Sequence, residues 1–123
     1  MPHPSEHHPA GRTLSLEEAE ALADAMRAFG AGSRLRLLWA MLEGERTVEQ
    51  LSAATGLEHS ATSHQLRLLR HLGLVVGHRD GRRIVYDLYD DHVGELLEQA
   101  ISHVEHVRAG RARTFSTGAS AES

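Results

Sequence analysis

The dipeptide Asp80-Gly81 constrains the possible folds of this chain more than any other feature. It separates two runs rich in Val, Ile and Tyr, LVVGHR and RRIVYDL. An Asp-Gly pair between such runs is a strong signal for a β-hairpin closed by a two-residue turn. The segments on both sides of the hairpin carry helical patterns, so we expect a single hairpin attached to a helical body.

Four short helices are predicted before the hairpin, because apolar residues recur there at helical spacing between capping residues and glycines. Ser15 and Glu18 form the S-x-x-E pattern of a capping box at the start of the first helix. The other predicted starts are Ser33, Thr47 and Ser60, and the predicted stops are Gly30, Gly44, Gly56 and Gly73. The third and fourth helices, joined by a turn at residues 56–58, form a helix-turn-helix candidate.

A last helix is predicted from Asp90 or Asp91 to about Ala109. The order of elements predicts a mostly α fold: a winged helix-turn-helix with added N- and C-terminal helices that forms a homodimer. We expect a flexible, His-containing arm at residues 1–13, one dimerisation and DNA-binding domain at 14–109, and a disordered tail at 110–123. A chain of 123 residues buries only a modest core, so dimerisation would add stability.

Composition excludes several classes of protein. The absence of cysteine rules out disulfides, thiolate metal sites and thiol redox chemistry. No apolar run approaches the roughly 20 residues needed to cross a bilayer. The start MPHPSEHHPAGR also lacks the apolar core of a signal peptide. We therefore expect a cytoplasmic protein with no membrane partner.

The distribution of charge predicts one face that binds anions. The net charge of the chain is −4. Residues 59–83, however, carry five arginines and a single acid, which gives this segment a charge of +4. A basic segment in an acidic chain favours a polyanion at one face of the molecule.

Double-stranded DNA is the predicted partner of this basic segment. Small hydroxyl residues at a helix start would let the backbone approach DNA, a glutamine would read adenine, and arginines would contact phosphates. The predicted DNA-contacting residues are Ser60, Thr62, Ser63, His64, Gln65, Arg67 and Arg70 of the fourth helix and Arg79, Arg82 and Arg83 of the hairpin tip. The alternatives are a helical hairpin with a solvated polar face and a pure dimerisation module, which leaves the arginines unexplained.

The last helix predicts a metal site shared between two chains. On a helical wheel, His92, His103 and His106 fall on one flank of an apolar stripe. His92 and His103 are about 16 Å apart along the axis, whereas metal–ligand bonds are about 2 Å long. One helix therefore cannot bring both to one ion. Two antiparallel helices can, because Asp90 and His92 of one would meet His103 and His106 of the other at two equal sites.

One carboxylate and three imidazoles suit Zn(II), Co(II) and Ni(II) rather than soft ions. Asp90 and His92 converge only if Asp90 lies at or before the N-cap of the helix. The alternative is that these histidines are solvated surface residues, in a chain that has ten. A ligand pair on an exposed dimer helix offers neither an open pocket nor a general base, so we expect neither an enzyme nor a small-molecule substrate.

The chain from Leu16 to Ala109 resembles the ArsR/SmtB family of metal-sensing bacterial repressors. The segment HSATSHQLRLLRHLGLV is similar to the recognition helix of that family, and GHRDGRRIVY is similar to its wing. Asp90-x-His92, ten residues, and then His103-x-x-His106 is similar to the family's site on the last helix. The resemblance implies that this site forms across a dimer and that metal lowers the affinity for operator DNA. The family's other common site uses cysteines, which this chain lacks.

Within the family, the start Met1-Pro2-His3 resembles that of the NmtR-type nickel/cobalt sensors, whose N-terminal arm adds ligands. This resemblance implies Ni(II) or Co(II) at a site that also draws in His3 and the amine of Pro2. A closed tetrahedral set of the four helix ligands would instead favour Zn(II). Three alternatives stay open: a Zn(II)-responsive repressor, an arm that binds nothing specifically, and a winged-helix repressor that senses no metal.

Overall fold

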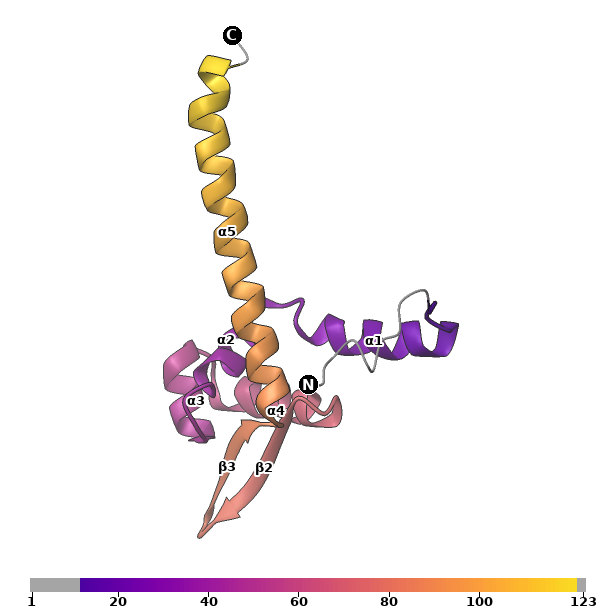
Figure 1. Ribbon diagram of the computed structural model, residues 1–123. Helices are drawn as coiled ribbons and strands as arrows, with labels where there is room; N and C mark the ends of the chain where they lie inside the picture. Colours follow the sequence, from indigo (N-terminus) through magenta and orange to yellow (C-terminus); the bar gives the residue numbers. More distant parts are fainter. Residues whose placement is uncertain (1–11, 122–123) are drawn as a thin grey trace.

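The computed structural model describes the backbone of residues 12–121 and the side chains of residues 12–112. Helices and strands follow the predicted order, and the result is a mostly helical winged helix-turn-helix (Figure 1). The elements are α1 (Leu16–Ala28), α2 (Gly32–Ala40), β1 (Arg46–Thr47), α3 (Val48–Thr55), α4 (His59–His71), β2 (Val75–Asp80), β3 (Arg83–Leu88) and α5 (Asp91–Ala121). The predicted arm at residues 1–13 lies almost wholly outside the described residues.

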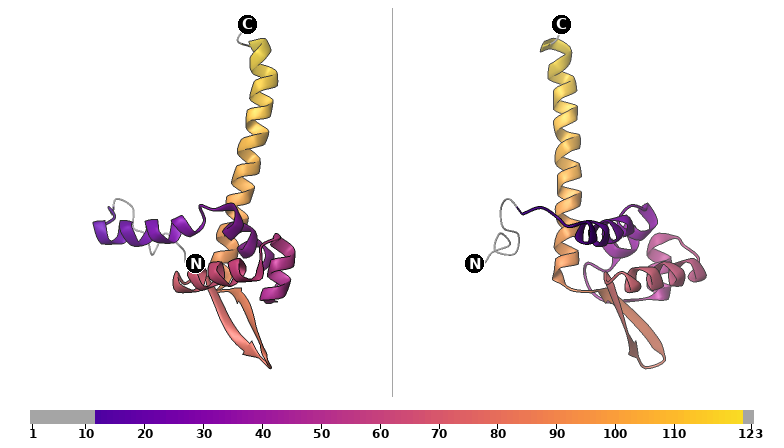
Figure 2. Two further views of the ribbon diagram at one scale, coloured as in Figure 1. Left: turned by 180° about the vertical axis from the view of Figure 1, so that it is seen from behind. Right: turned by 90° about the vertical axis from the view of Figure 1, so that its right-hand side faces the viewer.

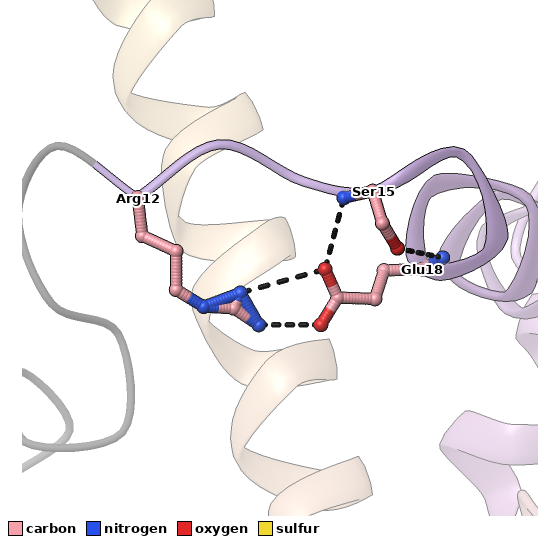
Figure 3. Close-up of polar contacts among 3 residues, drawn as sticks. All are labelled: Arg12, Ser15 and Glu18. Carbon is pink, nitrogen blue, oxygen red and sulfur yellow. Dashed lines mark hydrogen bonds and ion pairs between the residues drawn. The ribbon is translucent and has the colours of Figure 1, made fainter.

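Local capping accounts for the starts of two helices. The hydroxyl of Ser15 accepts a hydrogen bond from the Glu18 backbone N–H (3.0 Å), and the Glu18 carboxylate accepts one from the Ser15 N–H (2.9 Å). Figure 3 shows this pair together with Arg12, which forms an ion pair with Glu18. The hydrogen bond from the Ser15 backbone, followed by the charge of Arg12, lowers the pKa of Glu18. Thr47 and Gln50 form the same reciprocal cap on α3.

Two predicted helix starts differ from the structure, because the observed N-caps lie two residues before the predicted ones. The second helix begins at Gly32 with Ala31 at its N-cap, and the fourth begins at His59 with Glu58 at its N-cap; neither has a side-chain cap. Ser33 and Ser60 therefore lie inside the first turns rather than capping them. The glycine stop of α3 is confirmed, since Gly56 adopts a left-handed conformation with φ of 76°.

The hydrophobic core lies where α2, α3 and α4 meet the sheet and the start of α5. Its most buried side chains are leucines of the three helices, with Val93 and Leu97 entering from α5. Leu66 and Leu69 face this core from α4. Burying these side chains fixes α4 against α3 and leaves the opposite face of α4 in solvent.

The wing is a three-stranded antiparallel sheet in the order β1-β3-β2. The predicted hairpin is confirmed, but its two turn residues are Gly81 and Arg82, because Asp80 still pairs with Arg83 as the last residue of β2. The two-residue strand β1 was not predicted, because its pairing with Val85 and Tyr86 depends on the third dimension rather than on a local pattern. Gly77 lets the Tyr86 ring lie across β2, since an added Cβ would lie 2.9 Å from Tyr86 Cε1.

Helices α1 and α5 both project from the body, as Figures 1 and 2 show. The predicted end of the last helix at Ala109 is wrong, because α5 continues to Ala121. Gly110 lies within the helix, and an added Cβ there would meet no heavy atom within 4 Å. An isolated glycine costs a helix only about 1 kcal/mol relative to alanine, so it need not stop one. No helix within residues 12–121 is apolar enough over a sufficient length to span a bilayer.

Two arginines of α2 join this helix to its neighbours. Arg34 donates from Nε to the Ala28 carbonyl (2.8 Å) and from Nη2 to the Arg27 carbonyl (2.9 Å) at the end of α1. Arg36 donates to the carbonyls of Thr55 (3.0 Å) and Ala54 (3.3 Å) at the end of α3. Each guanidinium satisfies carbonyls that have no partner within their own helix and lies at the negative end of the helix dipole.

Candidate DNA interface and metal-binding helix

The helix-turn-helix holds most of the predicted DNA-contacting residues in positions that a ligand can reach. Ser60, His64, Arg67 and Arg70 are exposed on α4, and Ser63 and Gln65 are partly exposed. Because the apolar face of α4 is buried, these side chains gather on the remaining surface of one helix. The side-chain oxygen of Gln65 is buried and has no hydrogen-bond partner within the described residues.

The prediction that Thr62 contacts DNA is wrong. Its side chain is fully buried, with 0% exposed. The Thr62 hydroxyl accepts a hydrogen bond from the Ser52 hydroxyl (2.9 Å) and donates one to the Glu58 carbonyl (2.9 Å). The Thr62 side chain therefore links α4 to α3 through a hydrogen bond and is not accessible to a nucleic acid.

The wing carries the other predicted contacts. Arg79, Arg82 and Arg83 are all exposed around the hairpin tip. Figure 1 shows that the hairpin and the C-terminal part of α5 project from opposite sides of the body. A projecting strand pair with cationic side chains can lie along a DNA groove and contact phosphates.

At the start of α5, Asp90 and His92 converge. Asp90 directly precedes the helix, and its Oδ1 accepts hydrogen bonds from the backbone N–H groups of His92 (3.0 Å) and Val93 (3.4 Å). The other carboxylate oxygen, Oδ2, lies 3.2 Å from His92 Nδ1. The condition set by the sequence is met: Asp90 stands at the N-cap, where its carboxylate reaches the imidazole two residues later.

The contact between these side chains shifts both pKa values. The hydrogen bond from His92 lowers the pKa of Asp90, and the hydrogen bond to Asp90 raises the pKa of His92. The carboxylate is thus held ionised, as a metal ligand must be. A proton on His92, however, would compete with a metal ion, because an imidazole binds metal only when neutral.

More carboxylates surround this pair. A cavity of about 560 Å³ beside the start of α5 is lined by Glu43, Asp87, Asp90, Asp91, Glu95 and Glu98, with backbone and apolar groups between them. Carboxylates gathered around a concave surface create a negative electrostatic potential, which attracts cations. The surroundings of Asp90 and His92 therefore favour a metal cation electrostatically.

The second histidine pair lies on the projecting part of α5. His103 and His106 are both exposed and are spaced one helical turn apart. Among the described residues of one chain, no group of three or more His, Asp or Glu side chains is placed to hold a metal ion. Asp90, His92, His103 and His106 are thus divided into two separate pairs on one chain. His3 and Pro2, the other predicted ligands, lie outside the described residues.

The apolar stripe of α5 is only partly covered by its own chain. Val93 and Leu97 are buried against the body, while Leu96, Ile101 and Val104 are 41–44% exposed. The apolar face of helix α1 is also only partly covered, since Leu16, Leu22 and Met26 are at least half exposed. Unpartnered apolar faces on two projecting helices are typical of a protein that buries them in an oligomer.

Sequence reasoning assigned no role to His59 and His78, and it missed Ser52 and Arg36. In the structure His59 Nε2 lies 3.6 Å from Glu49, and His78 Nε2 lies 3.2 Å from Glu45. Each pair joins residues ten or more positions apart, so no local pattern could have indicated it. The same is true of the bond from Ser52 to Thr62 and of Arg36 at the end of α3.

Comparison with known proteins agrees with this architecture. Residues 32–76 match the family described as bacterial regulatory protein, arsR family. The chain is 50% identical over 97 residues to the HTH-type transcriptional regulator NmtR of Mycobacterium tuberculosis, covering 79% of this chain and 81% of that protein. The solution structure of apo-NmtR superposes with a TM-score of 0.66 at 47% identity, over 80% of this chain and 83% of that one.

A further solved structure bears on assembly. The homodimeric winged helix-turn-helix DNA-binding domain of Mb0332 from Mycobacterium bovis, described as a possible ArsR-family transcriptional regulator, superposes with a TM-score of 0.68. The identity is 29%, and the superposition covers 76% of this chain and 90% of that domain. These relatives are transcriptional regulators rather than enzymes.

Proposed function

Because the chain belongs to the ArsR family of bacterial regulatory proteins, we propose that it is a metal-responsive transcriptional repressor. It binds operator DNA as a homodimer in the cytoplasm and is released when metal binds between the two α5 helices. Residues 14–109 make up its dimerisation and DNA-binding domain. The direction of the metal effect follows the family resemblance.

The observation that carries this proposal is the contact between Asp90 and His92 at the start of α5. A carboxylate oxygen of Asp90 and a ring nitrogen of His92 already lie 3.2 Å apart, which supports their assignment as one half of a metal site. The other half, His103 and His106, lies too far along the same helix to join it. An antiparallel α5 from a second copy would bring the two halves together twice in each dimer.

The donor set fits a borderline divalent ion. Carboxylate oxygen and imidazole nitrogen suit Ni(II), Co(II) and Zn(II), and no thiolate is available to favour a softer metal. We favour Ni(II) or Co(II), because the N-terminal His3 and the amine of Pro2 would raise the coordination number above four. Zn(II) is the alternative if the four helix residues close the site.

In this proposal, side chains of α4 and of the wing make the contacts with DNA. Ser60, Ser63, His64 and Gln65 meet base edges or phosphates from α4, while Arg67, Arg70 and the wing arginines Arg79, Arg82 and Arg83 contact phosphates. When bound, the ion supplies a cross-link between the two α5 helices. The two α4 helices are then held at a separation that suits successive half-sites less well. By linkage, DNA weakens metal binding by the same factor.

Operator affinity with and without metal tests the function. With Ni(II), Co(II) or Zn(II) present at saturation, the operator Kd should rise by about 5- to 150-fold. Replacing both histidines, His103→Ala with His106→Ala, should abolish this rise without changing the metal-free Kd. Glu105→Gln, between them on the same helix, is the matched control and should respond as the wild type does. A Kd that depends on salt but ignores every divalent ion would leave a winged-helix repressor that senses no metal.

The absorption spectrum of the Co(II)-loaded dimer tests the choice of metal. Weak visible bands at one Co(II) per chain would indicate five or six ligands and support nickel or cobalt sensing with the arm engaged. Intense bands at that stoichiometry would indicate a four-coordinate site of Asp90, His92, His103 and His106, and hence a Zn(II) sensor. Repeating the measurement with His3→Ala shows whether the arm contributes a ligand.

A further inference from the structure

Arg36 touches two parts of the molecule that a metal-responsive repressor must connect. Its guanidinium donates hydrogen bonds to the carbonyls of Thr55 (3.0 Å) and Ala54 (3.3 Å) at the end of α3. The same side chain lines a groove of about 660 Å³ whose opposite wall is α5. One residue of α2 therefore contacts both the helix-turn-helix and the space beside the metal-binding helix.

The DNA-binding side of this contact is stiff. Helix α3 is joined to α4 by the bond between the Ser52 and Thr62 hydroxyls, which is 2.9 Å long and sits beside fully buried core leucines. Within the described residues, the two bonds from Arg36 are the only side-chain hydrogen bonds between α2 and α3. Arg36 is therefore the side chain through which α2 forms hydrogen bonds with the end of α3.

The α5 side of the contact is an apolar surface rather than a set of hydrogen bonds. The groove is apolar, and α5 contributes Leu97, Ala100, Ile101 and Val104 to it, the last of these directly after His103. Leu35 and Trp39 of α2 face it from the other side and are 37% and 46% exposed. In the proposed dimer a second α5 would cover Ile101 and Val104, so these side chains would connect the paired α5 helices to the groove wall that faces Arg36.

We propose that Arg36 is the residue that couples α5 to the recognition helix α4. A shift of the paired α5 helices changes the groove wall that faces Arg36, and the guanidinium transmits that change to the end of α3. The inference rests on the proposed function, because it needs metal at α5 to alter operator binding. It specifies which side chain carries the effect.

The test compares the wild type with Arg36→Gln, whose amide is too short to hold both carbonyls. The ratio of operator Kd with and without the bound metal should fall from about 5- to 150-fold to less than about 3-fold. The metal Kd in the absence of DNA should stay within about 3-fold of the wild-type value, because Arg36 contacts none of the proposed ligands. Trp39, the single tryptophan, should still change its fluorescence on metal binding. It lines the groove beside α5, and the substitution removes only the hydrogen bonds to α3.

Arg34→Gln is the matched control. Arg34 lies two residues away on α2 and caps α1 through the same kind of contact, but it neither lines the groove nor touches α3. Both variants are compared at protein concentrations where sedimentation shows that they are dimeric. There, Arg34→Gln should keep the wild-type ratio of operator Kd with and without metal. If Arg36→Gln fails to fold, Arg36→Lys, which keeps one charge-assisted bond but not the fork, decides the matter through an intermediate ratio.

Three results would overturn the proposal. A folded Arg36→Gln dimer with the wild-type ratio would show that coupling takes another route. An equal loss of the ratio in the Arg34 and Arg36 variants would show general destabilisation rather than coupling. A wild-type Kd that does not respond to metal would overturn the proposed function itself, and that result is visible before any variant is made.

Discussion

Single side chains decide how rigidly α4 is presented to DNA. Thr62 and Ser52 place two hydroxyls in contact between α3 and α4, and the Thr62 hydroxyl also satisfies the Glu58 carbonyl at the start of α4. Hydroxyls removed from water must find partners, and here they find each other. The angle between the two helices is therefore fixed by a polar contact as well as by the leucines around it.

A double-mutant cycle on this pair should reveal the contact. Ser52→Ala and Thr62→Val each remove one hydroxyl, and their effects on the free energy of unfolding should fall short of additivity by about 0.5–1.5 kcal/mol. Urea unfolding of the wild type, both single variants and the double variant measures the difference. Additive effects would mean that the two hydroxyls do not stabilise each other.

Protonation of Glu18 should destabilise α1 at low pH. The pKa of this carboxyl is lowered from its usual value of 4.5, so the folded state binds its proton less readily than the unfolded state. Its contribution is fully present above the unfolded pKa and is lost as pH falls through the lower folded pKa. Amide exchange or circular dichroism of α1 should show the loss, and Glu18→Gln should flatten this pH dependence. Glu17→Gln, in the same helical turn, is the control and should leave it in place.

At this scale, sequence reasoning succeeds where the interaction is local. The capping residues Ser15 and Thr47 and the convergence of Asp90 with His92 involve positions two or three residues apart. It fails at Thr62, because a hydroxyl at a helix start is equally suited to a phosphate or to a neighbouring helix. Only the position of Ser52 on α3 decides between them.

The elements differ in how far local pattern determines them. The hairpin of β2 and β3 follows from Asp80-Gly81, whereas β1 exists only because its backbone pairs with β3. Helix α5 extends beyond its predicted end at Ala109, because nothing at Gly110 forces the backbone out of helical geometry. Stop signals such as glycine are permissive, so the length of a projecting helix is less predictable than its start.

The wing should be sensitive to any side chain at Gly77. An added Cβ would lie 2.9 Å from Cε1 and 3.2 Å from Cδ1 of the Tyr86 ring, so Gly77→Ala should force the ring to move at a cost of about 1–3 kcal/mol. Urea unfolding measures the loss, and weaker operator binding should accompany it. Gly32→Ala, where an added Cβ meets nothing within 4 Å, should be neutral or slightly stabilising. Equal effects of the two substitutions would contradict this account of the wing.

For the whole molecule, the exposed apolar faces of α1 and α5 and the divided ligand set lead to the same arrangement. A single chain leaves Leu96, Ile101 and Val104 partly in water and separates its two ligand pairs along one helix. In the proposed dimer a second copy would resolve both, because antiparallel α5 helices would cover the stripe and complete the sites. The spacing of the two ligand pairs along one helix predicts this arrangement from the sequence, whereas the contacts of Arg36 with the end of α3 could be found only in the structure.

The central claim is that each metal site takes its ligands from two chains, and mixed dimers test it most directly. One chain carries Asp90→Ala with His92→Ala, the other carries His103→Ala with His106→Ala, and neither alone should bind Co(II) stoichiometrically. After unfolding and refolding together in equal amounts, half of the dimers should be mixed, each with one intact site. Titration should then give roughly one quarter of a Co(II) per chain. No recovery of binding in the mixture would contradict a site shared between subunits.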